Sequence, residues 1–91
     1  MIFQASHIFT ENTPVRIIDL LGTDEVENFT ARKVSGAGAF YIGNENVSSI
    51  SYGFSMDSVE GIYFPKINLQ INPNLYVCGD PGVSISILAW Q

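Results

Sequence analysis

The sequence predicts an all-β fold, an antiparallel β-sandwich with the jelly roll as a candidate form, and three observations favour it. Short apolar runs alternate with turn residues along the second half of the chain. The turns recur roughly every 8 to 12 residues, a spacing typical of sandwich strands. The run 83–90 alternates between two faces with a period of two residues. The 91 residues suffice for a single domain, 1–91, around one core.

The first half of the chain contains four expected strands and one short segment of helical character. Pro14 has no amide proton and therefore suits a strand start or a sheet edge. Gly22-Thr23-Asp24-Glu25 resembles a cap before a short helix, so we expect a helical turn or a loop at 20–27. The expected strands are 2–9, 15–19, 29–34 and 39–42.

The second half contains one segment with clear alternation and several weaker ones. In 66–71, Ile67, Leu69 and Ile71 alternate with polar residues, which predicts an antiparallel strand with one wet face. A further strand is expected at 75–78. The Ser-rich segments are expected to be weakly extended pieces, at 47–50 and 51–56. The expected turns lie at 43–46, 57–61, 72–74 and 79–82.

The last expected strand, 83–90, has one uniformly apolar face. Its other face begins with serines and then becomes apolar at Leu88 and Trp90. An exposed strand does not normally end in this way. We therefore expect either another part of the fold or another subunit to cover Leu88 and Trp90, and the pattern leaves both alternatives open.

Composition excludes several classes of function. Charged residues make up 14% of the chain, where about 25% is usual. The net charge is −5 and Arg32-Lys33 is the only basic pair, so we expect no nucleic-acid partner. No segment has the length of a membrane-spanning helix and no signal peptide is evident, so we expect no membrane association. Cys78 is the only cysteine, which excludes an intrachain disulfide and favours a small buried side chain.

The residues provide no recognisable catalytic or metal-binding motif. His7 is the only histidine and shares its predicted face with apolar neighbours, so we expect a partly buried strand residue. Nucleophile-elbow, phosphate-loop and zinc spacings are all missing from the sequence. We therefore predict a protein that is not an enzyme and has no cofactor. The acidic segment 19–28 is better explained as a solvated loop than as a calcium site, although a metal there stays an alternative.

Two aromatic residues stand out as candidates for partner contact. Tyr52 and Phe54 lie in a polar, Ser-rich context and are the most plausible exposed aromatics. A sugar-binding module presents several aromatic residues on one surface, whereas a core or subunit interface buries them. Packing is the favoured interpretation, with glycan binding as the alternative.

A series of short motifs follows in a fixed order over about residues 30–91. They are Ala31-Arg32-Lys33-Val34-Ser35-Gly36, Tyr41-Ile42-Gly43, Asn46-Val47-Ser48, Gly53-Phe54-Ser55-Met56, the run 66–71, Leu75-Tyr76-Val77, a Gly-rich turn and the run 83–90. This order resembles that in small β-sandwich proteins and domains of tailed-bacteriophage virions. The segment between Met56 and Lys66 departs from the pattern, because it is longer than the short turn usual there.

The resemblance implies a structural role without catalytic residues. Proteins of this kind decorate or cement a capsid shell, or form parts of fibres and spikes. The expected function is a decoration or cement subunit on the capsid surface of a virion, with the major capsid protein or other virion proteins as partners. The alternative is a carbohydrate-binding or receptor-binding module of a fibre or spike. We also expect a homo-oligomer, with a trimer favoured and with Leu88 and Trp90 near a subunit contact.

Overall fold

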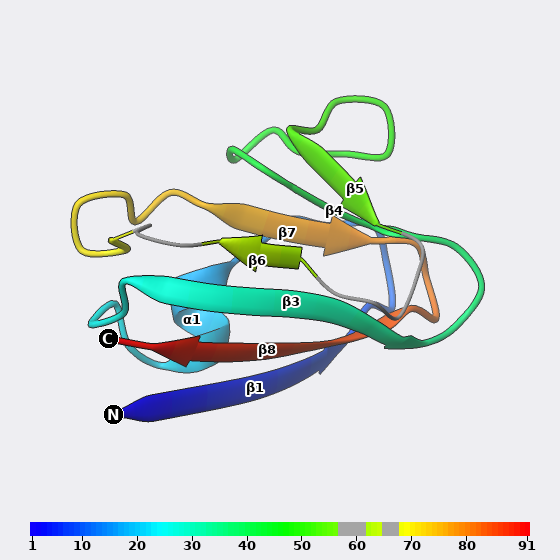
Figure 1. Ribbon diagram of the computed structural model, residues 1–91. Coiled ribbons are helices and arrows are strands. Elements are labelled where there is room, and N and C mark those ends of the chain that lie inside the picture. Colours follow the sequence, from blue (N-terminus) through cyan, green and yellow to red (C-terminus); the bar gives the residue numbers. More distant parts are fainter. Residues whose placement is uncertain (57–61, 65–67) are drawn as a thin grey trace.

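The computed structural model describes residues 1–56, 62–64 and 68–91, and these form two packed antiparallel sheets (Figure 1). One sheet has the strand order β1-β8-β3-β6 and the other has the order β2-β7-β4-β5. This confirms the predicted all-β sandwich. The strands are β1 (Ile2–Ile8), β2 (Val15–Arg16), β3 (Asn28–Ser35), β4 (Phe40–Gly43), β5 (Phe54–Met56), β6 (Ile62–Phe64), β7 (Tyr76–Gly79) and β8 (Ser84–Trp90).

The pairing of the strands is that of a jelly roll. Strand β1 pairs with β8, β2 with β7, β3 with β6 and β4 with β5, so the first four strands meet the last four in nested order. Further pairs, β3 with β8 and β4 with β7, complete the two sheets. Eight strands that alternate in this way between two sheets define the jelly-roll form of the sandwich.

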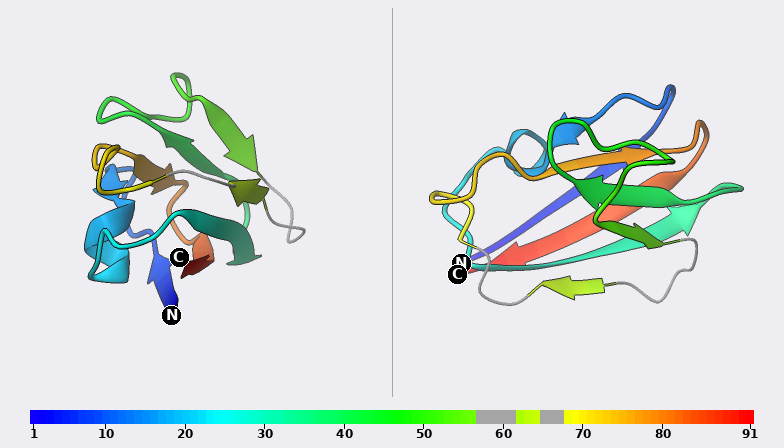
Figure 2. Two further views of the ribbon diagram at one scale, coloured as in Figure 1. Left: turned by 60° about the vertical axis from the view of Figure 1, so that its left-hand side comes forward. Right: turned by 90° about the horizontal axis from the view of Figure 1, so that it is seen from above.

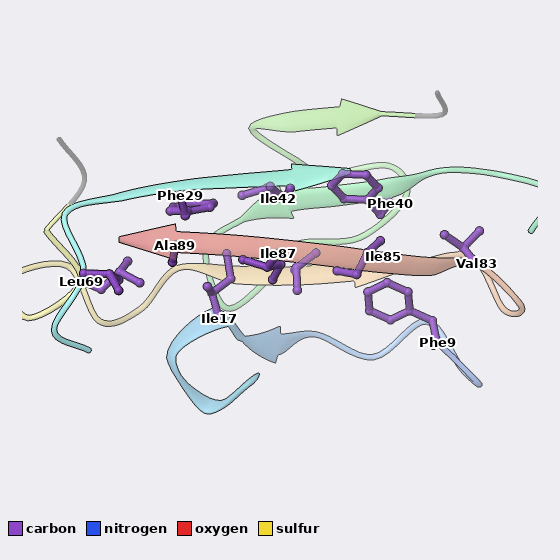
Figure 3. Packing of buried hydrophobic residues seen from close by; sticks show 13 residues of the cluster. Phe9, Ile17, Phe29, Phe40, Ile42, Leu69, Val83, Ile85, Ile87 and Ala89 are labelled. Atoms are coloured by element: carbon purple, nitrogen blue, oxygen red, sulfur yellow. The ribbon is translucent and has the colours of Figure 1, made fainter. Parts of the chain in front are cut away.

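The core lies between the two sheets and is built around β8 (Figure 3). Strand β8 is hydrogen-bonded on both sides, to β1 and to β3. Its inward residues Ile85, Ile87 and Ala89 are at most 1% exposed, as the alternation predicts. The opposite sheet contributes Phe40, Ile42 and Val77 among others, so the core is a layer of interdigitated side chains from both sheets.

One expected strand, 15–19, is wrong beyond its first two residues. Only Val15–Arg16 pairs with β7, and the chain then turns into the short helix α1 (Ile17–Leu21). Ile17 is buried and Ile18, Leu20 and Leu21 pack against the core, so the spacing i, i+3, i+4 makes one apolar face. Gly22, with a φ of 75°, ends the helix as a left-handed cap, and its N–H donates to the Ile18 carbonyl.

The expected strand 66–71 is also wrong where the structure describes it, and residues 66 and 67 lie outside the described residues. Residues 69–71 form a turn instead. The Oδ1 atom of Asn68 accepts hydrogen bonds from the N–H groups of Gln70 and Ile71, at 2.9 and 3.4 Å. The Asn68 side chain therefore provides local hydrogen bonds to backbone N–H groups that a neighbouring strand would otherwise bind. Leu69 is buried in the core while Ile71 is 76% exposed. In a strand these two residues would lie on the same face and would be buried together.

Gly36 lies where the β3–β4 connection contacts the β7–β8 turn, at one end of the sandwich. Gly36 follows β3 with a φ of 101°, a backbone conformation that residues other than glycine rarely adopt. A Cβ atom there would overlap the backbone of Gly82 and Val83. The close approach holds the β3–β4 connection against the β7–β8 turn.

Candidate functional site

Two surfaces carry the residues singled out from the sequence, and the first is the outer face of the β1-β8-β3-β6 sheet. Leu88 and Trp90 lie on this face, because the residues that alternate with them are buried. Ile2 lies directly opposite Trp90 in the register of β1 and β8. Ile2 is 72% and Leu88 41% exposed, whereas Trp90 is half-buried. We call Ile2, Leu88 and Trp90 the terminal patch.

The rest of this outer face is mostly polar, with Ile8 exposed at the far end of β1. A depression of about 240 Å³ next to Leu88 is lined by Gln4, Thr30, Arg32 and Ser86. A shallow surface of this kind, with an apolar end, suits contact with another protein better than enclosure of a small molecule.

The second surface is the outer face of the β2-β7-β4-β5 sheet, which is covered by the loop 44–53. Val47 in this loop is 3% exposed and packs over Cys78 of β7, which is fully buried. The Cys78 thiol lies 3.6 Å from the Val47 carbonyl oxygen. Neither residue belongs to the main core cluster. The sequence predicts only a weak extended piece at 47–50, and its pattern contains no signal for this small second core.

The loop 44–53 is held in place by its own polar groups. The Asn44 side chain accepts from the Asn46 N–H at 2.9 Å, and the Ser48 and Ser51 backbones exchange two hydrogen bonds. The Gly53 N–H donates to the Ile42 carbonyl and brings the chain back to β4. Because the loop is fixed at both ends, it positions Tyr52 in one place.

Tyr52 lies against Tyr41 of β4, with ring centroids 5.3 Å apart. The Tyr41 hydroxyl lies 3.3 and 3.4 Å from the two carboxylate oxygens of Asp80. Asp80 also accepts from the Ala39 N–H at 2.9 Å. Burial and the neighbouring Asp80 carboxylate raise the pKa of Tyr41 above its ordinary value of 10.0, since both disfavour the phenolate.

The structure places Tyr52 and Phe54 on opposite faces of the β4–β5 pair. Phe54 lies opposite Ile42, whose side chain is in the core, so Phe54 points toward the core side of this edge strand. Tyr52 instead covers Tyr41 on the outer side. Both are about half exposed, at 50% for Tyr52 and 47% for Phe54. They are therefore two separate contacts and do not form a joint aromatic surface.

Two hollows meet at Gly43 and Asn44 beside Tyr52. One, of about 280 Å³, is lined by Gly43, Asn44, Ser51, Tyr52 and Gly53. The other, of about 540 Å³, is lined by Gly43, Asn44, Ile71, Asn72, Pro73, Asn74 and Leu75. Because the two hollows share Gly43 and Asn44, we refer to them together as the amide groove, after their lining residues Asn44, Asn72 and Asn74.

The other residues considered from the sequence, His7, Cys78 and the acidic segment, make packing or ion-pair contacts. His7 packs edge-on against Phe9, with ring centroids 4.8 Å apart. Burial raises the pKa of the Cys78 thiol, the opposite of what a nucleophilic thiolate requires. In the acidic segment, Asp19 forms an ion pair with Arg16 at 3.3 Å. Within the described ranges, no group of three or more His, Cys, Asp or Glu side chains is placed to hold a metal ion. The described helix is also too short to cross a membrane.

Comparisons with protein-family models, with curated proteins and with solved structures return no match. The chain is therefore defined here by its fold, a jelly-roll sandwich, and by the two surfaces described above.

We predict that Val47 protects Cys78. In the native protein Cys78 should react with a thiol reagent only when the structure opens, because the side chain is fully buried. Val47→Ala removes a buried side chain that anchors the loop beside Gly43, and by analogy with other large-to-small changes it should destabilise the packing of the loop by about 1–2 kcal/mol and loosen its cover over Cys78. The reaction rate, measured under native conditions, should rise in the variant. Ile50→Ala in the same loop is the control, because Ile50 is 93% exposed, and an equal rise there would contradict the packing role of Val47.

We also predict a loss of stability at alkaline pH that depends on Tyr41. Its raised pKa means that folding favours the neutral phenol, so this contribution is complete below pH 10 and is lost as the pH rises through the raised pKa. Chemical denaturation of the wild type and of Tyr41→Phe, followed over this range, should show a steeper decline for the wild type. Asp80→Asn should lower the pKa of Tyr41 in an absorbance titration. Parallel declines in the wild type and Tyr41→Phe would show that Tyr41 does not contribute.

Proposed function

We propose that this protein is a decoration or cement subunit that binds a capsid lattice on the surface of a virion. The observation that carries the proposal is the terminal patch, an exposed apolar cluster at one end of a mostly polar sheet face. Exposed apolar clusters rimmed by polar residues are typical of protein contacts. The resemblance of residues 30–91 to tailed-phage virion proteins supplies the partner, the major capsid protein or a neighbouring virion protein.

The form of the sandwich agrees with a structural role. Jelly rolls occur in viral capsid proteins, but the fold also serves lectins and other functions, so it supports the proposal without deciding it. The low content of charged residues suits a subunit that has part of its surface covered in the assembled particle. The homo-oligomer expected from the sequence is a separate prediction, and its favoured trimer competes with the two-fold dimer inferred below.

We predict that Leu88→Asp abolishes attachment to the particle. The substitution places a charge in the middle of the terminal patch, on a side chain that is already 41% exposed, so folding should be retained. The measurement is co-sedimentation of the purified protein with capsids that lack it, and thermal melting checks the fold.

Val34→Asp is the matched control, because Val34 is 47% exposed and lies toward the other end of β3 from the terminal patch. It should bind as the wild type does. If Leu88→Asp binds equally well, the terminal patch is not the attachment surface. If the protein is missing from purified particles and its deletion leaves their stability unchanged, the decoration role itself is wrong.

A second candidate function, glycan recognition, is favoured by the amide groove. Sugar-binding sites combine an aromatic face with hydrogen-bonding side chains. Here Tyr52 borders a groove that is also lined by Asn44, Asn72 and Asn74. This role belongs to a fibre or spike module and would place the contact on the sheet opposite the terminal patch.

We predict that, if this second function holds, saturable binding on a glycan array is lost in Tyr52→Ala and retained in Phe54→Ala. The two residues have nearly equal exposure but lie on opposite faces of the β4–β5 pair. Equal loss in both variants would point to a general loss of structure. Absence of any saturable binding by the wild type would remove this candidate.

A further inference from the structure

Strand β1 is a long free edge of the β1-β8-β3-β6 sheet. It pairs with β8 on one side, and no described strand lies on its other side (Figure 1). Its seven residues, Ile2–Ile8, include no Asp, Glu, Lys, Arg, Pro or Gly. Helix α1 lies beside β1 (Figure 2), and Phe3 and the apolar residues of α1 pack against the same core.

The other three sheet edges differ from β1. Among the residues that the structure describes, the edge strands β6 and β5 have three residues each, and β2 has two residues preceded by Pro14. Short strands, prolines and charges are the devices by which proteins prevent pairing at an edge. Strand β1 has none of them. This contrast indicates that the β1 edge is a site where another strand pairs.

The hydrogen-bonding pattern shows which groups this edge offers. The Phe9 N–H donates to the Val83 carbonyl at 2.9 Å, so the odd-numbered residues of β1 face β8 in the alternating antiparallel ladder. The backbone N–H and C=O groups of the even-numbered residues therefore point away from β8. These residues are Ile2, Gln4, Ser6 and Ile8.

We propose that this edge pairs with the same edge of a second copy of the chain, around a two-fold axis that runs between Ala5 of one copy and Ala5 of the other. Antiparallel pairing with this centre sets Ile2 opposite Ile8 of the second copy and Gln4 opposite its Ser6. Every such pair joins two even-numbered residues, so the outward N–H and C=O groups of both copies meet in hydrogen-bonded pairs. The resulting interface is isologous, as a two-fold axis requires.

The side chains of β1 favour a second copy as the occupant. Ile2 and Ile8 are 72% and 64% exposed on the outer face, at opposite ends of the strand. In the two-fold arrangement Ile2 of each copy lies beside Ile8 of the other copy, and the contact buries both side chains. An uncharged strand also meets its own copy without like-charge repulsion, although each chain has a net charge of −5. The inference goes beyond the proposed function and does not depend on it.

The first test is the mass of the protein in solution, measured by sedimentation over a range of concentrations. The mass should rise from one chain to two, since a strand pair alone buries less area than a permanent interface. In the dimer, the amide protons of Gln4, Ser6 and Ile8 should exchange about tenfold more slowly at high than at low concentration. The amides of Phe3, Ala5 and His7 already bond to β8 and should not change. A single-chain mass at all concentrations, or a trimer, would overturn the proposal.

A charge exchange tests the register. Ile2→Lys and Ile8→Glu should each weaken the dimer, and the double variant should restore it, because the lysine at position 2 then faces the glutamate at position 8 of the other copy. Within one copy these positions are about 20 Å apart, so no ion pair forms inside a monomer. Failure of the double variant to restore the dimer, with folding intact by circular dichroism, would refute this register.

Leu88→Lys is the matched control for the surface involved. Leu88 lies on the same outer face but one strand inward, opposite Gln4 in the register. The edge-paired dimer should persist in this variant. If Leu88→Lys abolishes self-association while Ile8→Glu leaves it intact, the copies meet through the terminal patch and the edge proposal is wrong.

Discussion

Burial of strand β8 between two neighbours and beneath the opposite sheet is the interaction on which the rest of the structure depends. Its inward side chains supply the centre of the core, and its backbone holds β1 and β3 in register. Since β1 and β3 each continue into a strand of the other sheet, fixing them to β8 also sets the distance between the sheets. The nested pairing of the jelly roll follows from this arrangement. So does the position of the terminal patch, because Leu88 and Trp90 must point outward when their neighbours point inward.

The loop 44–53 gives the opposite sheet a second, smaller core. Val47 covers Cys78 on a face that the strand pattern alone would leave open to water. The loop thereby fixes Tyr52 over Tyr41 and shapes the amide groove around Gly43 and Asn44. The two candidate surfaces therefore have different origins. The terminal patch is a direct result of strand alternation, whereas the groove depends on how one loop folds back over its sheet.

Strand alternation was a reliable guide where a strand pairs with a neighbour over four or more residues, and it failed where local contacts compete. The expected strands at 2–9, 29–34, 39–42, 75–78 and 83–90 agree with the structure to within a residue or two. In 15–19 the isoleucines suit either a strand or a helix, and packing of both Ile17 and Leu21 against the core favours the helix. Asn68 ends the alternation of 66–71 because its side chain accepts hydrogen bonds from the N–H groups of Gln70 and Ile71. The separation of Tyr52 from Phe54 could not be predicted, because Tyr52 lies in the loop and not in a strand.

By itself the sequence determined the fold class, the inward face of β8, and that Leu88 and Trp90 lie on the opposite face of that strand, because a period of two residues is a property of the extended chain. It also determined that Cys78 has no disulfide partner within the chain. Only the tertiary structure decided which strands pair, and therefore that β1 is a free edge while β8 is central. It alone decided that Val47 buries Cys78 and that Asn44 and Asn72 border one groove. These features join residues far apart in the chain, and their contacts depend on long-range packing that no local pattern encodes.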